Sequence, residues 1–125
     1  MKGENGDFME NVFTSEKKLG FGLMRLPLLN PNDGSSIDIE LTKKMVDTFL
    51  EKGFTYFDTA WMYCGFNSEN IAKEVLVDRY PRNSFTLATK LHSGFIKTKE
   101  DRDKIFNSKE KKQELNILII IYLMI

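Results

Sequence analysis

The sequence FTYFDTAWMYCG, Phe54 to Gly65, joins an apolar run to a cluster of reactive side chains. Its first half alternates and is rich in aromatic and β-branched residues, which predicts a strand that ends near Asp58. Its second half places a carboxylate, a hydroxyl, a phenol and a thiol within the seven residues from Asp58 to Cys64. In α/β proteins the reactive groups gather at the carboxyl ends of the strands, so this stretch predicts both a fold class and a site.

The segment before this stretch predicts a strand, a turn and a helix. Lys18 to Leu28, KLGFGLMRLPL, has apolar residues suited to a first strand, and residues 29–36 are rich in turn formers. Ser36 or Asp38 can cap the following helix, and Gly53 is placed to end it. A spacing of three and four predicts the core face of this helix: Leu41, Met45, Val46, Phe49 and Leu50.

The segment after the stretch continues the alternation of helices and strands. A second helix is predicted to start at residue 67 or 68, and SFTLATKL, residues 84–91, predicts a third strand that ends at Lys90. Thr98 can cap a third helix, and the apolar residues 115–125 predict a fourth strand. Strands that alternate with helices imply parallel pairing through right-handed crossovers. The carboxyl ends of the strands then bring Asp58, Tyr63 and Lys90 to one edge of the sheet.

Length and composition fit one globular domain and exclude several functions. The chain has 125 residues, of which 42% are hydrophobic and 29% charged, and its formal net charge is zero. The charge balance gives no support to nucleic acid binding, and the apolar end is shorter than the ~20 residues that span a bilayer. One cysteine and an acidic start without an apolar run favour a cytoplasmic protein with no membrane partner.

Three of the predicted edge residues can cooperate in proton transfer. The phenol of Tyr63 is a proton donor at neutral pH, and it can protonate a carbonyl oxygen as negative charge develops there. An ammonium group from Lys90 eases that donation, and Asp58 can hold the lysine in place. The reaction that this relay serves is the addition of a hydride to the carbonyl carbon, which requires a nicotinamide cofactor because no side chain donates hydride.

At this point the sequence resembles the aldo-keto reductase family. The resemblance is carried, in the family's order, by LGFGLMRLP (residues 19–27), FDTAWMYCGFNSE (residues 57–69) and LATK (residues 87–90). It covers residues 18–107 and implies a (β/α)8 barrel, NADPH or NADH as cofactor, and a small carbonyl substrate. It also implies that Asp58, Tyr63 and Lys90 hold three of four catalytic places. RYPRNSFTLATKL, residues 79–91, is similar to a bacterial subgroup that often carries an iron–sulfur segment.

Cofactor contacts are predicted at Asp58, Met24 and Arg25, the last two because they follow the first strand and can face the pocket, and no residues are predicted to bind a metal. The chain also departs from the family. A complete barrel takes about 250 residues, so this α/β chain holds at most about four β/α units, the N-terminal portion of a TIM barrel. The family's catalytic histidine has no match. His92 shares the strand parity of Lys90, and it is either a substitute for that histidine or an ordinary loop residue.

The predicted organisation has three parts. Residues 1–17 form a loose lead-in, residues 18–107 a partial barrel, and residues 108–125 an atypical apolar tail. A shift of reading frame near residues 108–112 would explain the tail, because the neighbouring frame can encode a sequence of the family's type. We therefore expect a truncated product that is poorly active, and the downstream coding DNA tests this expectation.

A structural explanation stays open for each candidate residue. Asp58 can cap a turn, Tyr63 can be a surface aromatic, and Lys90 can be a solvated charge at the end of a strand. Trp61 either borders a substrate pocket or packs against neighbours, and Cys64 has no partner pattern for a metal site or a nucleophile. Two functions therefore remain: a carbonyl reductase, or a non-catalytic fragment that self-associates through unpaired strand edges.

Overall fold

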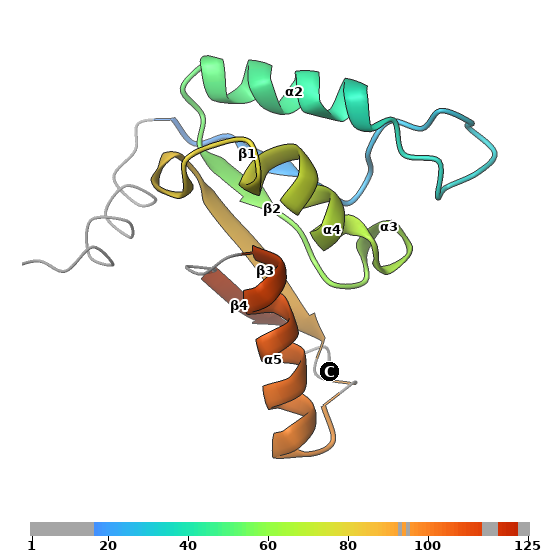
Figure 1. The fold of residues 1–125 in the computed structure, drawn as a ribbon, viewed down its shortest axis with the longest axis vertical. Coiled ribbons are helices and arrows are strands. Elements are labelled where there is room, and N and C mark those ends of the chain that lie inside the picture. Colours follow the sequence, from blue (N-terminus) through green and yellow to red (C-terminus); the bar gives the residue numbers. More distant parts are fainter. Residues whose placement is uncertain (1–16, 93, 95, 114–117, 123–125) are drawn as a thin grey trace, which may run out of the picture.

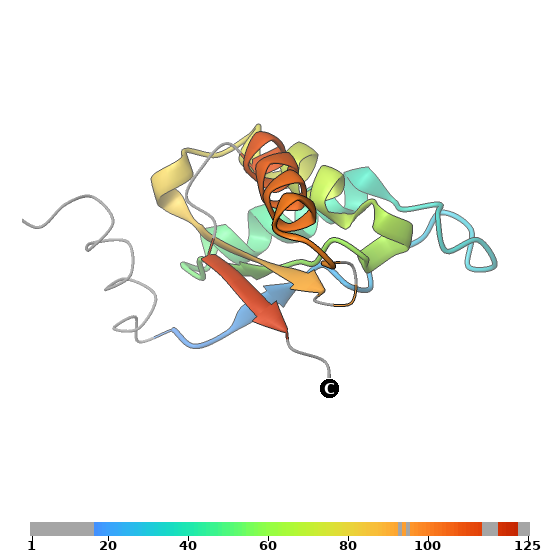
Figure 2. The same ribbon diagram turned by 90° about the horizontal axis from the view of Figure 1, so that it is seen from below.

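The protein is built around a parallel sheet with its helices on one side. The computed structural model describes residues 17–92, 94, 96–113 and 118–122. Within these residues the sheet has four strands in sequence order: β1 (Gly20–Gly22), β2 (Tyr56–Asp58), β3 (Thr86–His92) and β4 (Leu118–Tyr122). Three helices cover one face of this sheet (Figures 1 and 2): α2 (Ile39–Glu51), α4 (Ser68–Ala72) and α5 (Lys99–Gln113). The predicted α/β architecture with parallel strands is confirmed.

The register of the strands decides which side chains share a face. Phe57 pairs with Leu87 and Asp58 pairs with Ala88, so the two strands run level with each other. Because side chains alternate along a strand, Phe57 and Leu87 point toward the helices, whereas Asp58 and Lys90 share the opposite face. The register therefore separates an apolar helix-facing layer from a polar face at the carboxyl end of the sheet.

The core between sheet and helices is centred on Phe57, whose side chain is fully buried. Its ring centroid lies 5.5 Å from that of Phe21, 5.1 Å from that of Phe49 and 6.3 Å from that of Phe85. These distances are typical of favourable aromatic pairs. The remaining buried members of the core are aliphatic: Leu23, Leu26, Val46, Ile71, Ala72, Val75, Leu76 and Leu87.

Helix α2 begins and ends where the capping residues predict, but its buried face is narrower than the face predicted from the sequence. Asp38 caps it by accepting a hydrogen bond from the backbone N–H of Leu41 (2.9 Å), and Gly53, with φ of 83°, follows its end in a left-handed conformation. Val46 and Phe49 are buried as expected, whereas Leu41 and Met45 are 44% and 41% exposed. Their assignment to the core was wrong, because they face the outer side of β1, where no described element packs.

The strand ends also differ from the prediction. The first strand is only Gly20–Gly22 long, because the chain bends away after Leu23 donates its backbone N–H to the Asp58 carbonyl (2.8 Å). Strand β3 continues to His92, two residues beyond its predicted end at Lys90. The predicted fourth strand is confirmed by β4, which pairs in parallel with β3.

Short helical turns connect these elements. The turn α3 (Tyr63–Phe66) and the 3-10 turn η2 (Arg82–Ser84) were not predicted. The π-helical turn η1 (Lys73–Val77) continues α4 within the segment predicted as the second helix, and only its π-helical form was not predicted. Helix α5 continues through the predicted boundary at residue 107 to Gln113. Residues 1–16 of the predicted lead-in, and parts of the apolar tail, lie outside the described residues. None of the described helices has the length and apolar character needed to cross a membrane.

We expect Phe57→Ala to destabilise the protein by about 3–5 kcal/mol, because truncation of a fully buried ring leaves a cavity that the core fills only partly. The free energy of unfolding, measured by urea denaturation, checks this value. Leu29→Ala is the matched control, since Leu29 is 72% exposed and its truncation should change stability by less than about 0.5 kcal/mol. If both substitutions lowered the free energy of unfolding equally, Phe57 would not be part of the buried core.

Candidate active site

An ion pair joins the ends of β2 and β3 on the polar face of the sheet. The ammonium group of Lys90 donates hydrogen bonds to Oδ1 and Oδ2 of Asp58, each at 2.6 Å, and to the Thr59 carbonyl oxygen at 3.2 Å. The Lys90 side chain is 15% exposed and that of Asp58 is 32% exposed. A lysine held by three oxygen atoms at a partly buried edge has a fixed position, unlike a solvated surface charge.

Tyr63 lies against the same ammonium group. It starts the short turn α3, and the Lys90 nitrogen is 4.9 Å from the centroid of the Tyr63 ring. The backbone N–H of Tyr63 donates to the Ala60 carbonyl (3.2 Å), which closes a turn in the loop after β2. The structure thus brings Asp58, Tyr63 and Lys90 together, as predicted, although their catalytic roles stay a prediction.

The surroundings of Lys90 change its acidity in two opposing ways. Burial lowers the pKa of Lys90, whereas hydrogen bonds and charge interactions with Asp58 and Tyr63 raise it, and the raising influences prevail. Lys90 is therefore a cation at neutral pH. Because its pKa is raised on folding, this cation stabilises the folded state below the ordinary value of 10.5 and loses that effect as the pH rises through the raised value.

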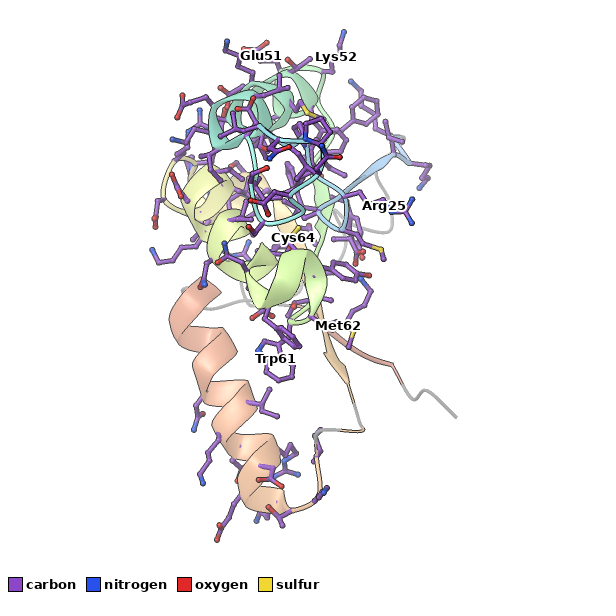
Figure 3. All side chains as sticks on the ribbon, turned by 90° about the vertical axis from the view of Figure 1, so that its right-hand side faces the viewer. Arg25, Glu51, Lys52, Trp61, Met62 and Cys64 are labelled. Atoms are coloured by element: carbon purple, nitrogen blue, oxygen red, sulfur yellow. The ribbon has the colours of Figure 1, made fainter. Side chains whose placement is uncertain are left out.

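The two other predicted cofactor contacts lie in the bend that follows β1. Met24 is 54% exposed, and Arg25 is exposed and projects outward from this bend (Figure 3). The backbone of Met24 is near the site, because its carbonyl oxygen lies 3.6 Å from the Cys64 sulfur. In the described part of the chain, no hydrogen bond or ion pair joins Arg25 to Asp58, Tyr63 or Lys90.

The turn that carries Tyr63 has an unusual backbone. Cys64, Gly65 and Phe66 have φ angles of 53°, 62° and 67°, so three successive residues are left-handed. This conformation is disfavoured for Cys64 and Phe66, which carry a Cβ atom, and such strain needs support from neighbouring contacts. Gly65 is the one member with an evident sequence signal for a left-handed turn.

Trp61 and Cys64, to which the sequence also drew attention, make packing contacts. Trp61 packs edge-to-face on Phe66, with ring centroids 5.0 Å apart, and projects from the loop that precedes α3 (Figure 3). The Cys64 sulfur contacts the Leu23 carbonyl oxygen at 3.4 Å, and burial raises the pKa of its thiol, which opposes nucleophilic behaviour. His92 is a strand residue instead of a loop residue, and its side chain lies outside the described part.

Four buried polar residues near the site were not identified from the sequence. Thr59 follows Asp58, Thr89 precedes Lys90, and Ser68 and Glu69 open helix α4. All four side chains are no more than 1% exposed. Thr59, Ser68 and Glu69 lie within the FDTAWMYCGFNSE motif and Thr89 lies within LATK, but no pattern in the sequence indicates that these side chains contact one another. Among the described residues, no cluster of three or more His, Cys, Asp or Glu side chains is suited to hold a metal ion.

Parallel strands joined by helices that cover a single face of the sheet, with polar groups at the carboxyl edge, have the arrangement of a (β/α)8 barrel. The model of the Aldo/keto reductase family matches residues 18–120, which is most of the chain, and the chain belongs to this family. No curated protein matches it with significance.

Solved structures of aldo-keto reductases have the same fold. A thermostable aldo-keto reductase in complex with the inhibitor epalrestat is 18% identical to this chain, with a TM-score of 0.64 over 89% of this chain and 40% of that one. An aldo-keto reductase from Klebsiella pneumoniae in complex with NADPH is 15% identical, with a TM-score of 0.62 over 82% of this chain and 34% of that one. The chain therefore spans well under half the length of these structures.

We expect Asp58→Asn to lower the pKa of Lys90, because burial lowers this pKa and only Tyr63 would remain to raise it. A ¹³C NMR titration of the lysine side chains, assigned with Lys90→Arg, measures this pKa. Asp47→Asn is the control, since Asp47 is also ion-paired, with Arg79 at 2.8 Å, but lies outside the site. An unchanged Lys90 pKa in Asp58→Asn would show that the ion pair does not form in solution.

Proposed function

We propose that this chain provides the proton-donating part of an NADPH-dependent carbonyl reductase site. The single observation that supports it most is the position of the Lys90 ammonium group between the Asp58 carboxylate and the Tyr63 ring. In this arrangement a phenol, an ammonium group and a carboxylate lie in sequence at the carboxyl edge of a parallel sheet. That is the edge where (β/α)8 enzymes carry out their chemistry.

Tyr63, Lys90 and Asp58 each have a distinct role in the proposed reaction. Tyr63 donates its hydroxyl proton to the oxygen of a small carbonyl substrate, and the neighbouring positive charge of Lys90 favours the phenolate that remains. Asp58 keeps Lys90 charged and oriented through its two hydrogen bonds. NADPH, when bound, would supply the hydride that adds to the carbonyl carbon, so that its two electrons form the new C–H bond while the oxygen takes the proton from Tyr63.

The exposed part of Asp58 fits the reacting end of such a cofactor. Its side chain remains 32% exposed although both carboxylate oxygens accept hydrogen bonds from Lys90. A carboxylate oxygen has a second lone pair, so Asp58 can also accept a hydrogen bond from a sugar hydroxyl of the dinucleotide. Met24 and Arg25, in the bend beside it, are exposed enough to contact the same ligand.

The activity of this chain by itself is a separate proposal. The chain spans 40% and 34% of the two reductase structures to which it is similar, and strand β4, which follows the lysine strand, contains no histidine. We therefore expect poor turnover from the isolated chain. Binding of NADPH is the more direct test of the site.

We expect saturable quenching or enhancement of NADPH fluorescence on titration with the purified chain, with a dissociation constant on the order of micromolar. Tyr63→Phe should retain this binding and lose carbonyl reduction by about 10²–10⁴-fold, the usual contribution of a general acid. Tyr80→Phe is the control, because the Tyr80 hydroxyl contacts Asp47 away from the site. Absence of NADPH binding to the folded chain would refute the reductase proposal.

A second candidate function, self-association, is favoured by an apolar groove on the outer side of β1. The groove has a volume of about 440 Å³ and lies on the helix-covered side of the sheet. Its lining is mainly apolar and includes Leu19, Phe21, Leu41, Met45, Phe49 and Phe54. Strand β1 pairs only with β2 in the described residues, so its other edge offers backbone hydrogen bonds beside this groove. A second copy of the chain can cover both features.

We expect the wild-type chain to associate with increasing concentration, and Met45→Glu to weaken this association by introducing a charge into the groove. Sedimentation velocity over a range of concentrations measures the change. Leu29→Glu is the matched control, because Leu29 is exposed outside the groove. If the wild-type chain sediments as a monomer throughout, self-association is excluded.

A further inference from the structure

Two adjacent polar residues, Ser68 and Glu69, lie buried beneath the candidate site. They are the first residues of α4, and their exposed fractions are 0% and 1%. Burial of a hydroxyl and a carboxylate is unfavourable unless they form hydrogen bonds, so these residues are expected to serve specific contacts. Ser68 binds Thr59, the neighbour of Asp58, and Glu69 binds Thr89, the neighbour of Lys90.

Ser68 connects the ends of β1 and β2. Its hydroxyl donates a hydrogen bond to the Leu23 carbonyl oxygen (2.9 Å) and shares a second hydrogen bond with the Thr59 hydroxyl (2.7 Å). Thr59 directly follows Asp58, and the Asp58 carbonyl oxygen accepts a hydrogen bond from the backbone N–H of Leu23 (2.8 Å). These bonds form a closed buried link, so the position of the Asp58 backbone depends on Ser68.

Glu69 connects the same helix to β3. The Thr89 hydroxyl donates to Oε1 of Glu69 at 2.6 Å, and Thr89 is fully buried. Thr89 directly precedes Lys90, and successive side chains of a strand point to opposite faces. A hydrogen bond that holds Thr89 toward the helix therefore directs Lys90 toward Asp58 and Tyr63.

The loop that carries Tyr63 runs from Thr59 to Ser68, the two residues whose hydroxyls are joined by a hydrogen bond. It leaves the sheet at Thr59, contains the left-handed residues 64–66, and rejoins the fold at Ser68. A backbone of this kind persists only when its surroundings hold it, because its residues prefer other conformations. The hydrogen bond between Thr59 and Ser68 fixes the two ends of the loop against each other.

We propose that Ser68 and Glu69 are positioning residues, which hold Asp58, Tyr63 and Lys90 in register by binding the neighbours Thr59 and Thr89. Ser68 sets the β2 side and the Tyr63 loop, and Glu69 sets the β3 side. Their significance for catalysis rests on the proposed reductase function, but the positioning itself concerns only this chain. The competing explanation is that these bonds stabilise the fold without a specific effect on the site.

Two readouts separate positioning from general stabilisation. The first is the rate at which an aromatic disulfide reagent modifies Cys64, the one cysteine of the chain and the direct neighbour of Tyr63. The second is the pKa of Lys90 from ¹³C NMR, which is sensitive to its distance from Asp58. Val46→Ala is the control, because it weakens the buried core at a residue of α2 without touching the site.

We expect Ser68→Ala to accelerate Cys64 modification about tenfold, at a temperature well below the unfolding midpoint, since the loop opens locally more often. Thr89→Val and Glu69→Gln should lower the pKa of Lys90, and Thr89→Ser, which keeps the hydroxyl, should restore it. Val46→Ala should lower the melting temperature and change neither readout. If the Ser68, Glu69 and Thr89 variants behave like Val46→Ala, the positioning proposal is overturned.

Thr59→Ser and Thr59→Val provide a second test if Ser68→Ala fails to fold. The serine keeps the hydroxyl that Ser68 contacts, whereas valine keeps the shape and loses it. Faster Cys64 modification in Thr59→Val alone supports the proposal, and equal rates in both contradict it. Neither readout requires NADPH or a carbonyl compound. A positive result without NADPH binding would therefore retain the positioning role and reject the reductase function, and the reverse result would do the opposite.

Discussion

The ion pair between Lys90 and Asp58 is the interaction on which the site depends. It joins neighbouring parallel strands at the carboxyl edge of the sheet, and it places a positive charge beside Tyr63. Burial alone opposes a charged lysine, so the pair requires both partners at close range. A carboxylate in this position therefore does more than close a turn, because it raises the pKa of the lysine that lies against the Tyr63 ring.

Elements with local chemistry could be predicted from the sequence. The cap at Asp38 and the left-handed Gly53 identify the ends of α2, because both act within a few residues of the backbone that they serve. The exposure of Leu41 and Met45 could not be predicted in this way. Their spacing shows that they lie on one stripe of the helix, but only the tertiary arrangement shows that no described element covers that stripe.

The candidate site likewise contains residues that could be predicted from the sequence and residues that could not. Asp58, Tyr63 and Lys90 could be identified because strand ends and a family motif marked them. The hydroxyls of Thr59 and Ser68 could not, because their contact depends on how a helix docks onto strands distant in sequence. The left-handed turn after Tyr63 lacked a signal for a related reason: side chains such as those of Cys64 and Phe66 disfavour it.

The parallel pairing of the strands also has a kinetic consequence. Gly20 pairs with Tyr56, Tyr56 with Thr86, and Ala88 with Leu118, so every contact between described strands joins segments about 30 or more residues apart. The local antiparallel bridge between Leu28 and Ile37 lies outside the sheet, and no two described strands of the sheet form a hairpin. Strand β1 therefore has no partner until more than 30 further residues have left the ribosome, and its apolar neighbours are open to wrong associations during that delay.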